Sequence, residues 1–148
     1  LPYFRNNFNM IHKEYEPIPL GYRADNTSLI FEYDTVNIII GDSKNGWVDA
    51  LKYYLAIITE VQYRGIRNII MNYDNVRPAG EKLRTFGGTA SGHEALLDVF
   101  KKITKVIKGK GNVINWRVKL EPIDCLDICN IIGEGVVVGG ELQKCLQL

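Results

Sequence analysis

The sequence lacks several features that would place it at once in a function class. Its three cysteines are odd in number and show no C-x-x-C spacing, which argues against a disulfide framework or a zinc site, so we expect reduced thiols. Charge of one sign is not in excess, because 18 Lys and Arg oppose 17 Asp and Glu to give a net charge of +1. Composition therefore implies neither a nucleic-acid partner nor an anionic membrane.

Long hydrophobic runs are also missing. No segment approaches the roughly 20 apolar residues of a membrane-spanning helix, and the opening LPYFRNNFNM lacks the basic-then-apolar pattern of a signal peptide. We therefore expect a cytoplasmic location. The 148 residues, 46% of them hydrophobic, suffice for one domain with a buried core.

Alternating strand and helix patterns predict an α/β fold. The β-branched runs TVNIII and RGIRNIIMNY indicate two buried strands. Between them, apolar side chains recur in steps of four and three, which predicts an amphipathic helix capped by Asp42 or Ser43. Those side chains are Trp47, Leu51, Tyr54, Ile58 and Val61. A strand, a helix and a strand in this order form a parallel crossover unit.

The flanking segments are less regular. Residues 1–35 show no clear period and read as an irregular lead-in, with NTSLIFEYD as a candidate edge strand or hairpin arm. A helix is predicted after a capping box formed by Ser91 and Glu94, and another at EPIDCLDICNIIG, where Pro122 suits the first turn. The basic segment KGKGNVINWRVKLEP between them is expected to be an exposed connector.

The segment RPAGEKLRTFGGTASGHE combines glycines and cations just before a predicted helix. Backbone N–H groups near glycines and a helix N-terminus both favour anions, and Arg77, Lys82 and Arg84 would add charge for a phosphate. The pattern is neither a Walker A loop nor a dinucleotide fingerprint. A phosphate-binding loop and a purely structural loop both remain open on these residues.

A second polar cluster, GDSKNG, follows the first predicted strand. Ligands of parallel sheets bind near the carboxyl ends of strands, so Asp42 could accept a hydrogen bond from a ribose hydroxyl. The alternative is that Asp42 and Ser43 only cap the helix.

Three longer stretches carry a family resemblance: IIIGDSKNGWVDAL, NYDNVRPAGEKLRTFGGTASGHEAL and PIDCLDICNIIGEGVVVGG. Together they resemble the adenosylcobalamin-dependent ribonucleoside-triphosphate reductases, the monomeric class II ribonucleotide reductases. The resemblance extends from about residue 11 to residue 140, nearly the whole chain.

The resemblance implies that residues 36–140 belong to a ten-stranded α/β barrel with parallel strands and crossover helices. Such enzymes convert ribonucleoside triphosphates to deoxyribonucleotides for DNA replication, through a cobalamin-initiated thiyl radical and a thioredoxin-like reductant. The matched segment would bind the allosteric deoxynucleoside triphosphate effector. The expected effector-binding residues are Asp42, Ser43, Arg77, Lys82, Arg84, Gly87 and Gly88.

Within that set, the resemblance implies that Asp42 holds the deoxyribose hydroxyl of the effector and that Arg77 contacts its phosphates. Residues 78–88 would form the first specificity loop. After VVVGG the family continues with an arginine-rich second specificity loop, whereas residues 141–148 read ELQKCLQL and form a divergent tail. A truncation, a frameshift and a true divergence all remain open for this tail, which also holds Cys145.

The radical and redox cysteines of the family have no counterpart here, since no N-x-C-x-E pattern occurs. We expect the segment to be inactive alone and to bind no cobalamin itself. Cys125 and Cys129, four apart on a predicted helix, are expected to pack in the core, and His93 is expected at the surface. Four lysines are expected on a solvated helix face: Lys101, Lys102, Lys105 and Lys108.

Two functions of different classes follow from the sequence. The chain is either the effector-binding part of a class II ribonucleotide reductase, or a non-catalytic nucleotide-binding or interaction domain derived from that family. A third outcome is that the segment binds nothing by itself, because part of a barrel leaves strand edges uncovered.

Overall fold

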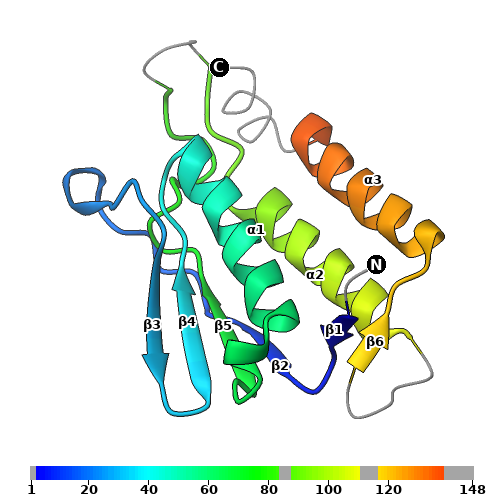
Figure 1. Ribbon diagram of the computed structural model, residues 1–148. Helices are drawn as coiled ribbons and strands as arrows, with labels where there is room; N and C mark the ends of the chain where they lie inside the picture. The colour runs from blue at the N-terminus through cyan, green and yellow to red at the C-terminus, as the bar shows by residue number, and fades with distance from the viewer. Residues whose placement is uncertain (1–2, 84–87, 111–116, 139–148) are drawn as a thin grey trace.

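The computed structural model describes residues 3–83, 88–110 and 117–138. These residues form a four-stranded sheet, a separate two-stranded sheet and three α-helices (Figure 1). The strands are β1 (Tyr3–Arg5), β2 (Asn9–His12), β3 (Ser28–Glu32), β4 (Thr35–Ile39), β5 (Asn68–Asn72) and β6 (Arg117–Lys119). The helices are α1 (Lys44–Thr59), α2 (Glu94–Lys108) and α3 (Pro122–Val138), with short 3-10 turns η1 (Leu20–Tyr22) and η2 (Val61–Tyr63).

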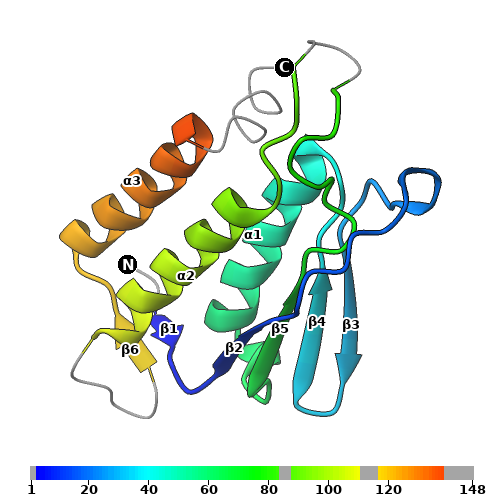
Figure 2. The ribbon, with the colours of Figure 1, turned by 180° about the vertical axis from the view of Figure 1, so that it is seen from behind.

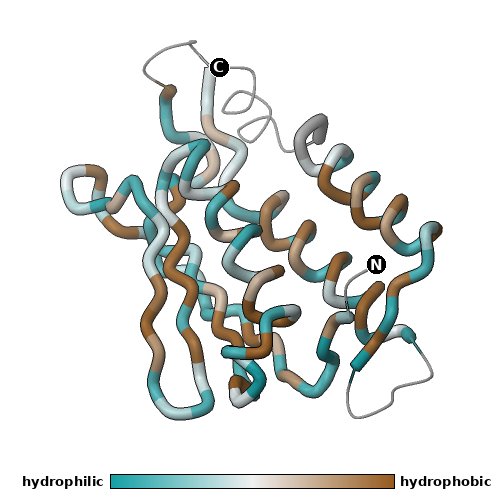
Figure 3. The backbone as a smooth tube through the Cα atoms, in the orientation of Figure 1, coloured by the Kyte–Doolittle hydropathy of each residue, from teal (hydrophilic) through white to brown (hydrophobic). Residues whose placement is uncertain are grey.

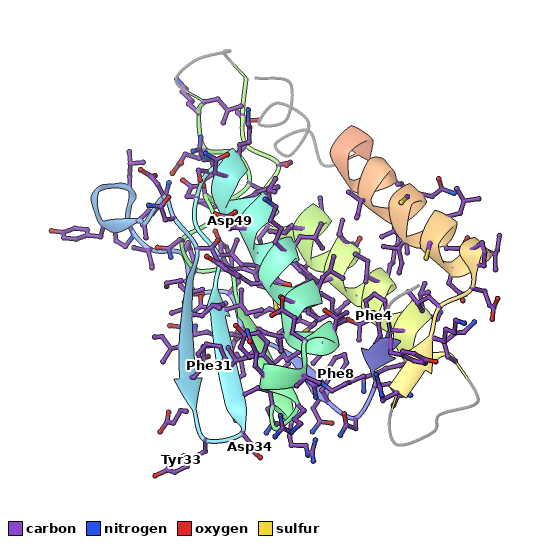
Figure 4. The ribbon with its side chains drawn as sticks, viewed as in Figure 1. Phe4, Phe8, Phe31, Tyr33, Asp34 and Asp49 are labelled. Atoms are coloured by element: carbon purple, nitrogen blue, oxygen red, sulfur yellow. The ribbon has the colours of Figure 1, made fainter. Side chains whose placement is uncertain are left out.

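The larger sheet has the strand order β2-β5-β4-β3. β4 and β5 run parallel, with Ile38 opposite Met71, and α1 connects them, so the predicted crossover unit is confirmed. β3 pairs antiparallel with β4 and lies at the sheet edge, which confirms the hairpin arm predicted from NTSLIFEYD. Tyr33 and Asp34 lie at the tip of this hairpin (Figure 4).

The mixed sheet corrects the expectation of parallel strands alone, and the described residues do not show a ten-stranded barrel. The lead-in of residues 1–35 contains β1 and β2 as well as β3. The connector expected to be exposed contains β6, where Val118 is 1% exposed. β6 pairs antiparallel with β1, so the first strand of the chain is held by a segment more than 100 residues away.

Alternation along β4 and β5 explains where the core lies. Val36 and Ile38 on β4 and Ile69 and Met71 on β5 are fully buried, whereas their neighbours in sequence are half-buried. α1 and α2 lie over one face of the larger sheet, and α3 packs against α2 on the outer side (Figures 1 and 2). Hydrophobic residues gather along the strands and helices, and the β3–β4 turn is hydrophilic (Figure 3).

The helix starts differ in part from those predicted. The residue before α2 is His93, which makes no side-chain capping hydrogen bond, so the capping box of Ser91 and Glu94 is wrong. Pro122 does open α3, as predicted. There Asp124 Oδ2 accepts a hydrogen bond from the backbone N–H of Glu121 at 2.8 Å, one half of a capping box that the sequence reading missed.

Across residues 3–83, 88–110 and 117–138, no helix is long and apolar enough to cross a membrane.

Candidate functional site

The parallel strands β4 and β5 end side by side, and the chain leaving each strand carries a polar group predicted from the sequence. Asp42 follows β4 and Arg77 follows β5. Asp42 Oδ1 accepts hydrogen bonds from the backbone N–H of Arg77 at 3.2 Å and from its Nε at 3.1 Å. The structure therefore brings together the two residues that the sequence placed in separate clusters, at the sheet edge where α/β proteins bind ligands.

Of the two residues predicted to cap α1, the structure shows Ser43 in that role. Its Oγ accepts a hydrogen bond from the backbone N–H of Gly46 at 2.9 Å and donates one to the carbonyl of Asp25 at 2.5 Å. Ser43 is thus the N-cap, and the carboxylate of Asp42 is directed to Arg77 instead. The purely capping interpretation of Asp42 is wrong.

A segment from the lead-in, residues 23–27, lies against this turn. The carbonyl of Ala24 accepts a hydrogen bond from the Asp42 N–H at 2.9 Å, and Thr27 Oγ1 accepts one from the Gly41 N–H at 2.9 Å. The approach is so close that a Cβ on Gly41 would lie 2.2 Å from the carbonyl oxygen of Asp25. Only glycine fits at this position, which the sequence reading did not assign.

Two further contacts hold residues 23–27 in place, and both reach the chain that follows β5. Asn75, which is 3% exposed, accepts a hydrogen bond from the Ala24 N–H through its Oδ1 at 2.9 Å. Arg23 binds the carboxylate of Glu81 with both terminal nitrogens, at 2.6 and 2.7 Å. These hydrogen bonds to the Glu81 carboxylate raise the pKa of the Arg23 guanidinium. No local pattern could have singled out Arg23, because its partner lies 58 residues away.

The glycine-rich loop is folded back on itself in the part that the structure describes. The Gly80 N–H donates to the Ala90 carbonyl at 2.9 Å, and the Leu83 N–H donates to Gly88 at 3.1 Å. Gly80 and Gly88 have φ values of 89° and 82°, which side-chain-bearing residues rarely adopt. Some of the glycines therefore serve the backbone conformation of the loop.

The predicted cations and glycines of this loop differ in their exposure and in whether the structure describes them. Lys82 and Gly88 are exposed to solvent next to the bridge that joins Lys82 to Thr89. Arg84 and Gly87 lie outside the described residues, so their predicted roles stay predictions. Arg77 has a side chain 26% exposed, and Asp42 one that is 9% exposed.

Aromatic side chains line the base of this region. The ring of His93 stacks on Tyr15 with centroids 4.0 Å apart, and the Tyr15 hydroxyl donates a hydrogen bond to the carbonyl of Val76. Burial raises the pKa of the Tyr15 hydroxyl and lowers the pKa of the His93 imidazole. His93 is half-buried, so it lies only partly at the surface, where it was expected.

Chemically, the site pairs a desolvated carboxylate acceptor with a guanidinium donor, an arrangement suited to binding a polyol phosphate. In the described part of the chain, no group of three or more His, Cys, Asp or Glu side chains could hold a metal ion.

Cys125 packs against the core as expected, but Cys129 is exposed, which corrects its core assignment. Cys145 lies outside the described residues. The four lysines of α2 are exposed, as predicted.

The family described as "B12-dependent ribonucleotide reductase, insertion domain" matches residues 13–107. The chain belongs to this family. The match contains both Asp42 and Arg77 and most of the elements that position them.

Proteins similar in sequence to this chain are named as reductases. It is 37% identical over 103 residues to the adenosylcobalamin-dependent ribonucleoside-triphosphate reductase of Lactobacillus helveticus, covering 68% of this chain and 13% of that protein. It is 35% identical over 107 residues to the enzyme of the same name from Euglena gracilis, covering 71% of this chain and 13% of that protein. A crystal structure of a B12-dependent class II ribonucleotide reductase matches with a TM-score of 0.63 and 25% identity, over 88% of this chain and 18% of that one.

Proposed function

We propose that the chain binds an allosteric deoxynucleoside triphosphate at the carboxyl ends of β4 and β5, as part of an adenosylcobalamin-dependent ribonucleoside-triphosphate reductase. The observation that carries the proposal is the contact between Asp42 and Arg77, which lie 35 residues apart in the sequence. Family membership supports it, because the matched relatives are named as such reductases.

Each side chain has a role that its chemistry suits. Asp42 accepts a hydrogen bond from the deoxyribose hydroxyl, and Arg77 donates to the phosphates with a planar guanidinium. Lys82, Arg84 and the backbone at Gly87 and Gly88 add donors from the loop. Ser43 has a positioning role, because its hydroxyl oxygen is already engaged with Gly46 and Asp25.

The activity of the whole enzyme is also part of the proposal. The complete protein would reduce ribonucleoside triphosphates by a thiyl-radical mechanism, act as a monomer and take electrons from a thioredoxin-like reductant. The chain spans 13% of the length of each of the two reductases compared above. The proposal therefore places the radical and redox cysteines in segments that correspond to the rest of those proteins.

The relatives are named as adenosylcobalamin-dependent enzymes. Adenosylcobalamin would supply the radical initiator of the complete protein, and we propose that it binds in segments outside this chain.

The test is isothermal titration of the purified chain with each deoxynucleoside triphosphate and, in parallel, with inorganic triphosphate. We expect at least one deoxynucleotide to bind about tenfold or more tightly than inorganic triphosphate, because the hydrogen bond to Asp42 needs a sugar hydroxyl. Equal affinity for all ligands, or no binding by a chain shown to be folded by circular dichroism, would contradict effector binding.

A further inference from the structure

A pocket of about 560 Å³ lies at the end of the molecule opposite the Asp42 site, close to where α1 ends and β5 begins. Four arginines line it, from three separate places in the chain: Arg5, Arg64 with Arg67, and Arg117. Its volume falls within the range of small-molecule sites, about 300–1,000 Å³. Phe4, labelled in Figure 4 beside β1, contributes to an apolar wall.

Arg5 is a buried cation without a counter-charge. Its side chain donates to the carbonyls of Ile57 at 2.6 Å and Ile66 at 3.0 Å, and its Nε has no hydrogen-bond partner. The residue is only 9% exposed. Burial and the nearby charge of Arg67 both lower the pKa of the Arg5 guanidinium, so its surroundings are electrostatically unfavourable to a cation. Buried charges in proteins are normally paired.

The other three arginines are exposed and carry no compensating carboxylate either. Arg64 and Arg67 donate to backbone carbonyls, and Arg117 lies over the ring of Tyr3 at 4.6 Å. In the parts of the chain that are described, no ion pair joins any of these four arginines to Asp or Glu.

The carbonyl end of α1 explains only part of this charge. A helix C-terminus is equivalent to roughly half a negative charge and favours one nearby cation, a role that Arg5 fills through Ile57. Among the described residues that line the pocket, Glu60 is the single acidic one. One carboxylate and a helix end leave a clear excess of positive charge around the pocket.

We infer that this pocket is a second anion site, which binds a phosphate-bearing small molecule through Arg64, Arg67 and Arg117. Guanidinium groups bind phosphate oxygens in a bidentate manner, and several of them converging on one cavity suit a diphosphate. The bound anion also offsets the charge of the buried Arg5. The site does not depend on the Asp42 site, because the two lie at opposite ends of β4 and β5.

The test uses inorganic pyrophosphate as the probe. Isothermal titration measures its affinity, and backbone amide NMR shifts report where it binds. We expect pyrophosphate to shift the amides of Gly65 and Val118, beside the pocket. The variant Arg64→Gln/Arg117→Gln removes two charges but keeps polar side chains at two exposed positions, so it should fold. It should weaken this binding about tenfold or more.

The matched control is Lys52→Gln/Lys105→Gln, which removes two exposed charges from α1 and α2 away from the pocket. It should change the affinity by less than about twofold, because general charge is screened at moderate salt. Equal weakening by both double variants would overturn the site and leave only non-specific attraction. The absence of shifts at Gly65 and Val118 would also overturn the site. The arginines would then be free to bind an acidic protein segment instead.

The two sites are distinguished in the same spectra. Shifts at the amides of Arg77 and Gly80 report on the Asp42 site, and Arg77→Ala should abolish those while leaving the shifts at Gly65 unchanged. Loss of one set of shifts without the other identifies which of the two proposals fails.

Discussion

Asp42 Oδ1 accepts hydrogen bonds from both the backbone N–H and the Nε of Arg77, at 3.2 and 3.1 Å, and Asp42 Oδ2 accepts from the same Nε at 3.3 Å. The first bond fixes the backbone that follows β5, and the second fixes the guanidinium. A ligand at this edge of the sheet would therefore meet a preformed pair of groups, and we expect a change in either residue to alter the position of the other.

Replacing Arg77 by alanine should weaken deoxynucleotide binding by roughly 1.5 to 3 kcal/mol, the cost of losing a charge-assisted hydrogen bond. Isothermal titration with the tightest-binding deoxynucleoside triphosphate measures this change. Lys52→Ala is the control, because Lys52 is exposed on α1 and outside the site. An unchanged affinity in Arg77→Ala would remove Arg77 from the binding site.

The pair should also act as a unit in a double-mutant cycle. Asp42→Ala releases the guanidinium of Arg77, so the effects of Asp42→Ala and Arg77→Ala on deoxynucleotide affinity should not add. We expect a coupling energy of about 0.5 to 3 kcal/mol, the range for residues in contact. Additive effects would show that each residue binds the ligand independently. Thermal destabilisation of Asp42→Ala with intact affinity would limit Asp42 to a structural role.

Gly41 should tolerate no side chain, because its Cβ would lie 2.2 Å from the backbone oxygen of Asp25. Gly41→Ala must displace residues 23–27 or the turn after β4, and we expect a loss of unfolding free energy of about 1 to 3 kcal/mol, as for overpacked sites. Gly21→Ala is the matched control, since nothing lies within 4 Å of its Cβ position. Urea unfolding of both variants decides the matter, and equal stability would mean that residues 23–27 do not pack as described.

The β4–α1–β5 unit could be predicted from sequence because its signals are local. Two β-branched runs and a helical period lie within one contiguous segment, and the cap at Ser43 is three residues from its partner Gly46. β1 and β6 could not be predicted, because each is three residues long and gains its stability from the other, across more than 100 residues.

The same distinction holds for the site. Asp42 and Arg77 were proposed as site residues because each stands in a motif shared with a family, but their direct contact was not foreseen. Arg23 carries no motif, and Asn75 was given no role within its stretch; the importance of both comes from partners 58 and 51 residues away. Propensity and spacing describe neighbours in sequence, whereas the position of residues 23–27 against the turn after β4 depends on long-range packing.

The start of α3 should make stability depend on pH in the acid range. Asp124 Oδ2 accepts hydrogen bonds from Lys110 Nζ at 2.5 Å and from the Glu121 N–H at 2.8 Å. The bond from Lys110, and next the bond from Glu121, hold the pKa of the Asp124 carboxyl below its ordinary value. The ionised form therefore stabilises the fold. This contribution is present above the unfolded pKa, about 3.9, and is lost as the pH falls through the lower folded pKa.

Asp124→Asn keeps an oxygen that can accept from Glu121 but removes the charge that faces Lys110. We expect the variant to be less stable than the parent chain at pH 7, with a difference in unfolding free energy that shrinks toward zero as the pH falls below about 4. Urea unfolding at a series of pH values measures this difference directly, and it cancels the titration of all other carboxylates. Asp127→Asn, an exposed position on the same helix, should show a small difference at every pH. A difference for Asp124→Asn that stays constant from pH 7 to pH 3 would mean that the contact with Lys110 does not stabilise the fold through its charge.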